Sequence, residues 1–310
     1  MTIAIQETLR AVFYAPFYSA LALGAFEKEG VEVVLKTSPR PSDAARGILD
    51  GSIDVTWGGP LRVIKTREEV PGCDIVCFCE VVTRDPFVLV GRAPCPGFKM
   101  ADLAGATLAT VSEVPTPWVC LQNDIRKSGM DPASIRRIAD QSMAENVESL
   151  RGGQVDVIQV FEPFVAEAIA AGVGHVWYAA ADRGPTSYTT FYARRDVVDA
   201  RRQEFVRLVR AIYRTQKWIH RAPPAEIAQV VADYFPHVPA TWLTAAMDRY
   251  QSLGVWGKNP YLPRSGYERL REAILAAGFA RAAASYDDAV YNAMASEVVG
   301  EDDEPPVVNA

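Results

Sequence analysis

The feature that most constrains this sequence is a regular alternation of short strand-like runs with helical patterns over about the first 200 residues. Residues 2–5 read as a strand, 17–28 as a helix closed by Gly30, and 31–36 as the next strand. Such alternation is typical of a largely parallel sheet covered by helices. Residues 203–277 carry helical patterns only. The sequence therefore predicts an α/β fold with C-terminal helices.

An internal repeat divides the alternating part into two similar units. Residues 44–60 and 147–163 each read as a helix, a glycine, and a strand that opens Ile/Val-Asp-Val and ends at a proline. Asp54 and Asp156 occupy the same place in the two segments. Two ordinary helix–strand turns can share this pattern by coincidence. Two similar half-chains nevertheless favour two similar lobes.

The composition is that of a globular protein and excludes several classes. The 310 residues are 49% hydrophobic and 23% charged, which is enough for two cores. The net charge is −6 and both signs are mixed along the chain, so no basic stripe indicates a nucleic-acid partner. No apolar run reaches the length of about 18 residues that a transmembrane helix needs.

Both ends of the sequence carry expectations. Residues 1–5 read as a strand rather than as the basic and apolar segments of an export signal. We therefore expect a cytoplasmic protein as the chain stands, or a periplasmic one if a signal was trimmed. Residues 299–310 are acidic and contain prolines, which predicts a disordered tail.

Five cysteines are present, an odd number that suits a reducing compartment better than a disulfide scaffold. Cys73, Cys77 and Cys79 lie close enough in sequence to suggest a metal-binding run. Cys77 and Cys79, however, fall at period two in the apolar stretch 75–79, where a free cysteine behaves as a small buried hydrophobe. We therefore predict no metal site and no cofactor.

The first 60 residues resemble the sulfonate-, nitrate- and thiamine-pyrimidine-binding proteins of ABC importers. The resemblance rests on Tyr14-Ala15-Pro16-Phe17-Tyr18, followed by Ala22, Gly24, Phe26 and Glu29-Gly30-Val31-Glu32-Val33. The second lobe of that family is similar to Asp102-Leu103-Ala104-Gly105 and to Ser128-Gly129-Met130-Asp131-Pro132. The resemblance extends over about residues 2–235 and involves no catalytic group.

This resemblance implies a two-lobed, type II periplasmic-binding-protein-like fold that closes on a small organic ligand by hinge motion. The first lobe would comprise residues 1–92 and 190–298, with the C-terminal helices packed mainly on it. The second lobe would comprise residues 93–189. The chain would cross between the lobes near 91–96 and return near 189–192. An ABC permease would be the protein partner.

Ligands of open α/β sheets bind outside the carboxyl ends of the strands, and this rule selects the candidate binding residues. Each candidate has a structural alternative, because loop arginines are commonly solvated, aromatic rings commonly pack in cores, and a polar residue before a helix commonly caps it. The predicted ligand-binding residues are Tyr14, Tyr18, Arg40, Trp57, Gly58, Arg84, Ser112, Thr116, Glu162 and Tyr188.

Trp57 and Glu162 end equivalent strands of the two repeats, so we expect them to face each other across the cleft. The indole could stack on a ring of the ligand. The carboxylate stands in an apolar setting and needs a partner, either in the ligand or in the other lobe. An acidic group of the ligand would be held by Arg40 or Arg84 together with the turn 112–116.

No catalytic constellation is visible, since the three histidines lie away from the candidate loops. Thiamine-pyrimidine synthases carry a histidine and a cysteine-rich run where this chain has 61–65 and 189–192, which contain neither. Aryl sulfinate desulfinases carry a cysteine and an arginine where this chain has Ala15 and Thr56. We therefore predict the solute-binding component of an ABC importer. A cytoplasmic enzyme of the same fold and a cytoplasmic metabolite sensor are the alternatives.

Overall fold

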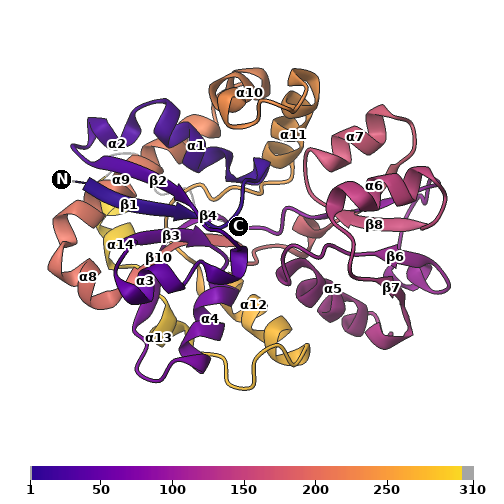
Figure 1. Ribbon diagram of the computed structural model, residues 1–310, viewed down its shortest axis with the longest axis horizontal. Helices are drawn as coiled ribbons and strands as arrows, with labels where there is room; N and C mark the ends of the chain where they lie inside the picture. Colours follow the sequence, from indigo (N-terminus) through magenta and orange to yellow (C-terminus); the bar gives the residue numbers. More distant parts are fainter. Residues whose placement is uncertain (1, 302–310) are drawn as a thin grey trace.

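The computed structural model describes residues 2–301, which form two five-stranded sheets in two separate lobes (Figure 1). The first sheet has the order β2-β1-β3-β10-β4, with strands β1 (Thr2–Glu7), β2 (Glu32–Thr37), β3 (Val55–Gly58), β4 (Ile75–Val82) and β10 (Thr189–Arg194). The second has the order β7-β6-β8-β5-β9, with strands β5 (Val88–Gly91), β6 (Thr107–Ala109), β7 (Arg136–Ile138), β8 (Val157–Val160) and β9 (His175–Ala179). The predicted two-lobed α/β fold is confirmed.

The two aspartates of the internal repeat make the same contacts in the two lobes. The backbone N–H of Asp54 donates to the oxygen of Ala4 (3.0 Å), and the Asp54 carboxylate accepts from the N–H of Ala4 (2.8 Å). Asp156 makes the same pair of bonds with Thr107, at 3.0 Å and 2.9 Å. Each aspartate thus ties the strand that follows it, β3 or β8, to the first parallel strand of its own lobe.

The chain crosses between the lobes earlier than the sequence predicts. Strand β5 falls in the predicted first lobe (1–92), yet it pairs antiparallel with β8 and β9 in the second sheet. The crossing segments are therefore residues 83–87 and 180–188 rather than 91–96 and 189–192. The apolar run of β5 fits either sheet, and only its pairing partners, which lie far along the chain, decide between them.

The two crossing segments run side by side and are joined by backbone hydrogen bonds. The N–H of Thr186 donates to the oxygen of Thr83 (2.8 Å), and the N–H of Tyr188 donates to the oxygen of Val82 (2.9 Å). They form a narrow two-stranded connection between the lobes, which is the geometry that a hinge requires.

Helices cover both sheets. The first lobe contains α1 (Ala15–Ala22), α2 (Ala25–Lys28), α3 (Arg46–Asp50), α4 (Pro60–Glu69), α8 (Arg195–Ala200) and α9 (Arg202–Ile219). The second contains α5 (Thr116–Lys127), α6 (Met143–Arg151) and α7 (Phe164–Ala170). The single helix expected over 17–28 is two helices, because Gly24 adopts a left-handed conformation (φ 63°) between them.

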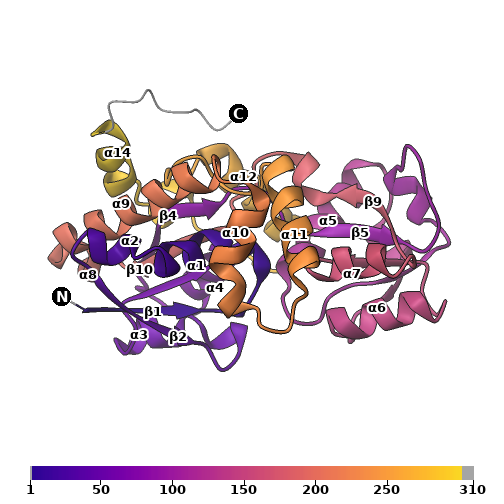
Figure 2. The same ribbon diagram turned by 90° about the horizontal axis from the view of Figure 1, so that it is seen from above.

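The C-terminal helices connect the lobes as well as covering the first. They are α10 (Pro224–Val231), α11 (Ala240–Ser252), α12 (Arg264–Ala276), α13 (Tyr286–Ala289) and α14 (Ala293–Gly300). Helix α10 packs on α1, but α11 contacts α7 and α12 contacts α5, and Figure 2 shows α10 and α11 between the lobes. Val299 and Gly300 belong to α14, which corrects the predicted start of the tail, and residues 302–310 lie outside the described residues.

Cys77 and Cys79 are fully buried in β4 as free thiols, as the sequence predicts. Burial raises the pKa of both thiols, so neither is a reactive thiolate. Within residues 2–301, no group of three or more His, Cys, Asp or Glu side chains is placed to hold a metal ion. Over the same range, no helix combines the length and the apolar character needed to cross a membrane.

Candidate functional site

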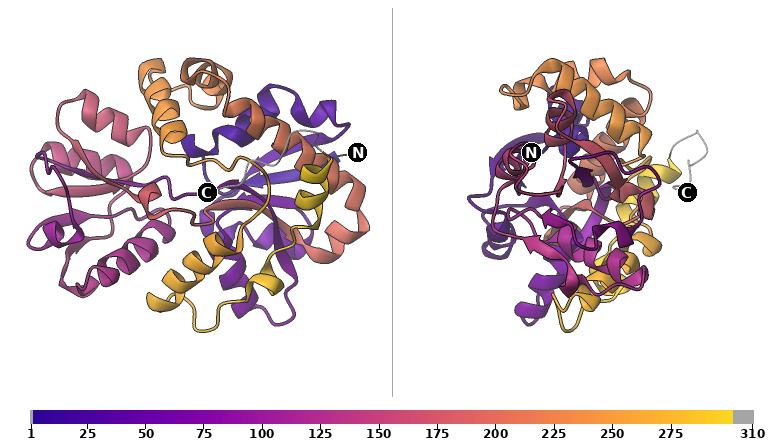
Figure 3. Two further views of the ribbon diagram at one scale, coloured as in Figure 1. Left: turned by 180° about the vertical axis from the view of Figure 1, so that it is seen from behind. Right: turned by 90° about the vertical axis from the view of Figure 1, so that its right-hand side faces the viewer.

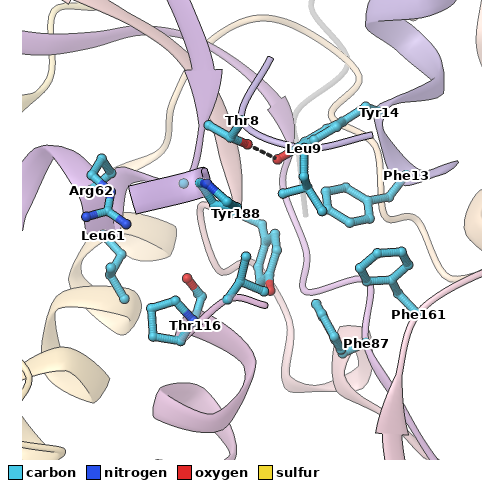
Figure 4. Close-up of a pocket in the computed structure, with 14 residues that line it drawn as sticks. Thr8, Leu9, Phe13, Tyr14, Leu61, Arg62, Phe87, Thr116, Phe161 and Tyr188 are labelled. Carbon is cyan, nitrogen blue, oxygen red and sulfur yellow. Dashed lines mark hydrogen bonds between the residues drawn. The ribbon is translucent and has the colours of Figure 1, made fainter. Parts of the chain in front are cut away.

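A cavity of about 60 Å³ lies between the lobes, at the carboxyl ends of the strands (Figure 4). Its walls come from the segments that follow β1, β3, β6 and β8 and from both crossing segments. One water needs about 10–15 Å³ of such space, so this arrangement of the lobes has room for a few waters. A larger ligand therefore requires the lobes to move apart.

One wall of the cavity is aromatic and is shared between the lobes. Phe13 of the first lobe meets Phe161 of the second edge-to-face, with ring centroids 5.1 Å apart. Phe87, in the first crossing segment, meets Phe161 at 5.1 Å, and Tyr188, in the second, lies 6.0 Å from Phe13. All four rings are buried. Edge-to-face pairs stabilise such a cluster beyond area burial alone, and an apolar part of a ligand would lie against it.

Arg62 supplies the positive charge of the cavity. It lies in the first turn of α4, is half-buried, and lines the space opposite the aromatic wall (Figure 4). Among the described side chains its guanidinium has no hydrogen-bond or salt-bridge partner, although its charge helps to lower the pKa of the Asp43 carboxyl; its backbone N–H donates to the oxygen of Gly59 (2.9 Å). A guanidinium presents a planar fork of donors that matches a carboxylate or sulfonate. An anionic group of a ligand would accept hydrogen bonds from this guanidinium.

The N-termini of two helices also point positive charge at this space. Helix α4 begins after Gly59, and α5 begins at Thr116 after Pro115; all three of these residues line the cavity. Neither N-terminus is capped by a side chain. Free N–H groups and the helix dipole both favour an anion there.

Hydroxyl groups complete the polar part of the cavity. The Tyr188 hydroxyl is buried and has no hydrogen-bond partner among the described residues. Tyr14 and Thr8 share a hydrogen bond of 3.1 Å, and burial raises the pKa of Tyr14 to about 12. Both tyrosines are therefore neutral and able to donate at physiological pH. An unpaired buried hydroxyl costs free energy, which a ligand acceptor would recover.

Of the residues predicted from sequence, Tyr14, Thr116 and Tyr188 line this cavity. Gly58 lies beside it: a Cβ added there would be 2.9 Å from the Thr8 side chain, so a larger residue would force the neighbouring side chains to shift. Ser112 instead lines a neighbouring groove that also contains Arg137. Ligand binding by these residues stays a prediction.

Trp57 and Tyr18 pack in the core below the cavity. The Trp57 ring stacks on Phe17 with centroids 4.5 Å apart and planes 10° apart, and the side chain is 1% exposed. The Tyr18 hydroxyl donates to the Glu7 carboxylate at 2.6 Å. Trp57 still belongs to β3, and its side chain points into the sheet packing rather than out of the strand end.

Glu162 is fully buried and has structural partners. Its carboxylate accepts from Arg249 Nε (2.7 Å) and from the N–H of Ala166 (3.0 Å), which lies in the first turn of α7. Burial raises the pKa of this carboxyl and Arg249 opposes the rise. Neither Glu162 nor Trp57 lines the cavity, which corrects the prediction that they face each other across it.

The two predicted arginines, Arg40 and Arg84, do not line the cavity. The arginine that does line it, Arg62, is not among the residues predicted from the sequence. The Arg40 side chain is 70% exposed and pairs with Asp43. Arg84 lines a separate pocket behind the crossing segments. Arg62 escapes a rule that inspects only strand-end loops, because it follows the loop by one helical turn. Extending the rule to the first turn of each following helix would have found it.

Comparison with known proteins decides the family. The model of the family described as "NMT1/THI5 like" matches residues 13–226. The chain belongs to this NMT1/THI5-like family. A curated relative, YtlA of Bacillus subtilis strain 168, carries the name "Putative binding protein"; it is 23% identical over 301 residues, which cover 96% of this chain and 90% of YtlA.

Two solved structures share the fold of this NMT1/THI5-like chain at low sequence identity. The alkanesulfonate-binding protein SsuA from Xanthomonas axonopodis pv. citri, bound to MOPS, has a TM-score of 0.69 at 15% identity and covers 94% of this chain and 98% of its own. The periplasmic nitrate-binding protein NrtA from Synechocystis PCC 6803 has a TM-score of 0.73 at 16% identity and covers 98% and 89%. The fold is that of two-lobed binding proteins.

Proposed function

We propose that this protein binds a small organic anion in the interlobe cavity and delivers it to an ABC permease. The observation that carries the proposal is Arg62, a half-buried guanidinium without a hydrogen-bond or salt-bridge partner among the described side chains, facing a cavity between two helix N-termini and an aromatic wall. The arrangement suits a carboxylate, sulfonate or similar oxyanion attached to an apolar or ring-containing body.

The names of the structural relatives support an anionic ligand. SsuA is named for alkanesulfonate and NrtA for nitrate, and both groups are oxyanions. The shared lining of the cavity supports hinge closure, because Phe13 and Phe161 come from different lobes and meet only when the lobes are together. A protein that hands its ligand to an importer works on the outer side of the membrane, and we propose that location.

The chemistry of the lining favours a binding protein over an enzyme. No histidine, cysteine or carboxylate lines the cavity within residues 2–301. These are the groups that most often act as nucleophile or general acid–base, and the Tyr and Thr hydroxyls that do line the cavity have no such base beside them in the lining to activate them. A bound ligand should therefore leave unchanged, and mass spectrometry of a confirmed ligand before and after incubation tests this.

The first test is a thermal-shift screen with alkane- and arylsulfonates, aromatic carboxylates, nitrate and pyrimidines. A ligand at a hundred times its dissociation constant stabilises the protein by about 2.7 kcal/mol. Arg62→Gln should weaken binding of each anionic hit about 10- to 100-fold, since a hydrogen bond to a charged group contributes about 1.5–3 kcal/mol.

Arg40→Gln is the matched control, because it removes the same charge from an exposed site outside the cavity. It should leave the dissociation constant unchanged. Hits that bind Arg62→Gln as tightly as the parent protein, by isothermal titration calorimetry, would contradict the proposed site. Turnover of a hit by highly purified protein would contradict the proposed function.

A further inference from the structure

A groove of about 310 Å³ lies where the second lobe meets the end of α12, and we call it the α5–α12 groove. The segment after β6, the first half of α5 and the end of β7 form one side, and residues 277–279 after α12 form the other. In the view from behind, α12 (yellow) lies next to α5 below the middle of the molecule (Figure 3, left). Pockets for small molecules commonly measure about 300–1,000 Å³, so the groove can hold one.

The α5–α12 groove and the interlobe cavity use different polar groups. Among the described residues they share only Val114 and Pro115, two apolar residues of the segment between β6 and α5. Arg62 lines the cavity and not the groove, whereas Arg137 lines the groove and not the cavity. A ligand of the groove is therefore recognised independently of the ligand that the cavity binds.

Arg137 supplies the charge of the groove, and neither of its own partners is an acid. Its Nε donates to the Thr110 hydroxyl (2.8 Å), and its Cζ lies 4.3 Å from the centroid of the Trp118 ring. Among residues 2–301 it forms no salt bridge, and burial lowers the pKa of its guanidinium without an acidic neighbour to oppose the fall. The side chain is exposed, but these two contacts hold it in one orientation. Its two terminal nitrogens are left to donate to a ligand.

The rest of the lining matches a ring that carries an acidic group. Trp118 of α5 and Phe279 after α12 are half-buried aromatic side chains on the two sides of the groove. The Ser112 hydroxyl forms no hydrogen bond with a described residue. The Gln122 oxygen accepts from Arg126 (3.4 Å), which leaves the amide N–H groups of Gln122 to donate. No carboxylate lines the groove within residues 2–301, so its polar groups favour an anion.

We propose that the α5–α12 groove is a second binding site, for an aromatic carboxylate whose carboxyl group pairs with Arg137 and whose ring lies against Trp118 and Phe279. A guanidinium can donate two parallel hydrogen bonds to a carboxylate. A flat ring buries apolar area against the aromatic side chains and pairs with them face-to-edge or offset. The ligand must carry both parts, because the groove offers one charged fork and two rings.

Both lobes contribute to this site. Trp118 packs with the core of the second lobe, whereas Phe279 packs with the cluster that contains Leu61 and Ile64 of the first. The groove is therefore complete only while the lobes are together, and an occupant that touches both sides favours the closed arrangement.

Fluorine NMR of 4-fluorobenzoate tests the site. The titration uses the Arg62→Gln protein, from which the charge of the interlobe cavity has been removed, and the fluorine resonance should shift saturably. Two probes each lack one part of the ligand: 4-fluorobenzamide keeps the ring without the charge, and trifluoroacetate keeps the carboxylate without the ring. Each should bind at least about tenfold more weakly, since either loss costs on the order of 1.4 kcal/mol or more. Equal binding of the amide or of trifluoroacetate would overturn the assigned ligand class.

Charge-matched variants in the same Arg62→Gln background locate the bound probe. Arg137→Gln should weaken 4-fluorobenzoate binding about 10- to 100-fold. Arg136→Gln is the control, because it removes the neighbouring exposed charge of β7, which does not line the groove. Phe279→Ala should also weaken binding, since it removes the ring on the first-lobe side of the groove.

Two results would overturn the proposal. One is an Arg137→Gln protein that binds 4-fluorobenzoate as tightly as the Arg136→Gln protein. The other is a probe that binds the parent but not the Arg62→Gln protein, because that probe occupies the interlobe cavity; this result would refute the groove while supporting the proposed function.

Discussion

The carboxyl group of Glu80 is fully buried in the first lobe, where β4 pairs with β10. Neither of its oxygens has hydrogen-bonding geometry to a described residue. Burial raises its pKa to about 8, and the nearby hydroxyls of Ser187 and Thr83 oppose the rise only in part. The side chain is therefore mostly protonated in the folded protein at neutral pH, whereas in the unfolded chain it ionises near its ordinary value of 4.5.

Glu80→Gln should raise stability at neutral and alkaline pH. A group whose pKa is raised by folding contributes stability that is fully present below its unfolded pKa. That contribution is lost as pH rises from about 4.5 to about 8. The loss at pH 7 is on the order of 3 kcal/mol, and glutamine removes the titration. Urea unfolding should show the variant more stable than the parent at pH 8 and nearly equal to it at pH 4.5. The same gain at both pH values would contradict this account.

Residues chosen by position alone reach the cavity, whereas residues whose side-chain direction matters do not, and ligand binding by any of them stays a prediction. Tyr14, Thr116 and Tyr188 follow strand ends or begin a helix, and they line the cavity. Trp57 lies one residue too early, still inside β3, and the alternation of a strand turns it into the core. Glu162 finds its partner Arg249 in a helix 87 residues away, which no local pattern encodes.

The crossing segments depend on a buried charge network. Arg183 lies in the second crossing segment. Its guanidinium bonds Asp85 of the first crossing segment (2.8 Å) and the carboxylate of Asp124 in α5. Asp85 is fully buried, and the Arg183 side chain is nearly so. Burial raises the pKa of Asp85 and the guanidinium opposes the rise. The network fixes both segments to the second lobe, so we expect rotation to occur on the side of the first.

Arg183→Gln should destabilise the protein by about 3–5 kcal/mol, because it leaves the carboxylate of Asp85 buried without a counter-charge. The double variant Asp85→Asn, Arg183→Gln should recover much of this loss, since no uncompensated charge remains at that position and Asn can still accept from the N–H of Phe87. Urea unfolding of the parent, the single and the double variant measures the difference. A double variant as unstable as the single one would show that lost packing, not the buried charge, sets the cost.

At the level of elements, local signals located the strands and helices but not all of their partners. The alternation and the repeat predicted two sheets, and the shared bonds of Asp54 and Asp156 explain why both segments carry the same Asp. Strand β5 was assigned to the wrong lobe because hydrophobic runs carry no information about which sheet they join. Arg62 was not predicted because the rule considered only the loops after strands, whereas the first turns of the following helices also face the strand ends.

At the scale of the whole molecule, two ion pairs among the described residues link the second lobe to the C-terminal helices. Arg249 of α11 bonds Glu162 at the end of β8 (2.7 Å), and Glu272 of α12 bonds Lys127 of α5 (2.9 Å). Their environments differ: Glu162 is fully buried, whereas both side chains of the second pair are about half exposed. Exposed pairs contribute about 0–1 kcal/mol and buried ones cost much more to break. The Arg249 contact should therefore dominate the balance between closed and open lobes.

Arg249→Gln should shift the protein toward an open arrangement. Without the guanidinium, Glu162 is left buried against α11 with no counter-charge, at a cost of about 3 kcal/mol, and opening of the lobes exposes it to water. The radius of gyration from small-angle X-ray scattering should rise, and a ligand found in the screen should dissociate faster. Lys127→Gln is the control and should change neither quantity. Near-ultraviolet circular dichroism should stay native-like in both variants. A closed radius of gyration in a folded Arg249→Gln protein would show that the aromatic contact of Phe13 with Phe161 is sufficient to keep the lobes together.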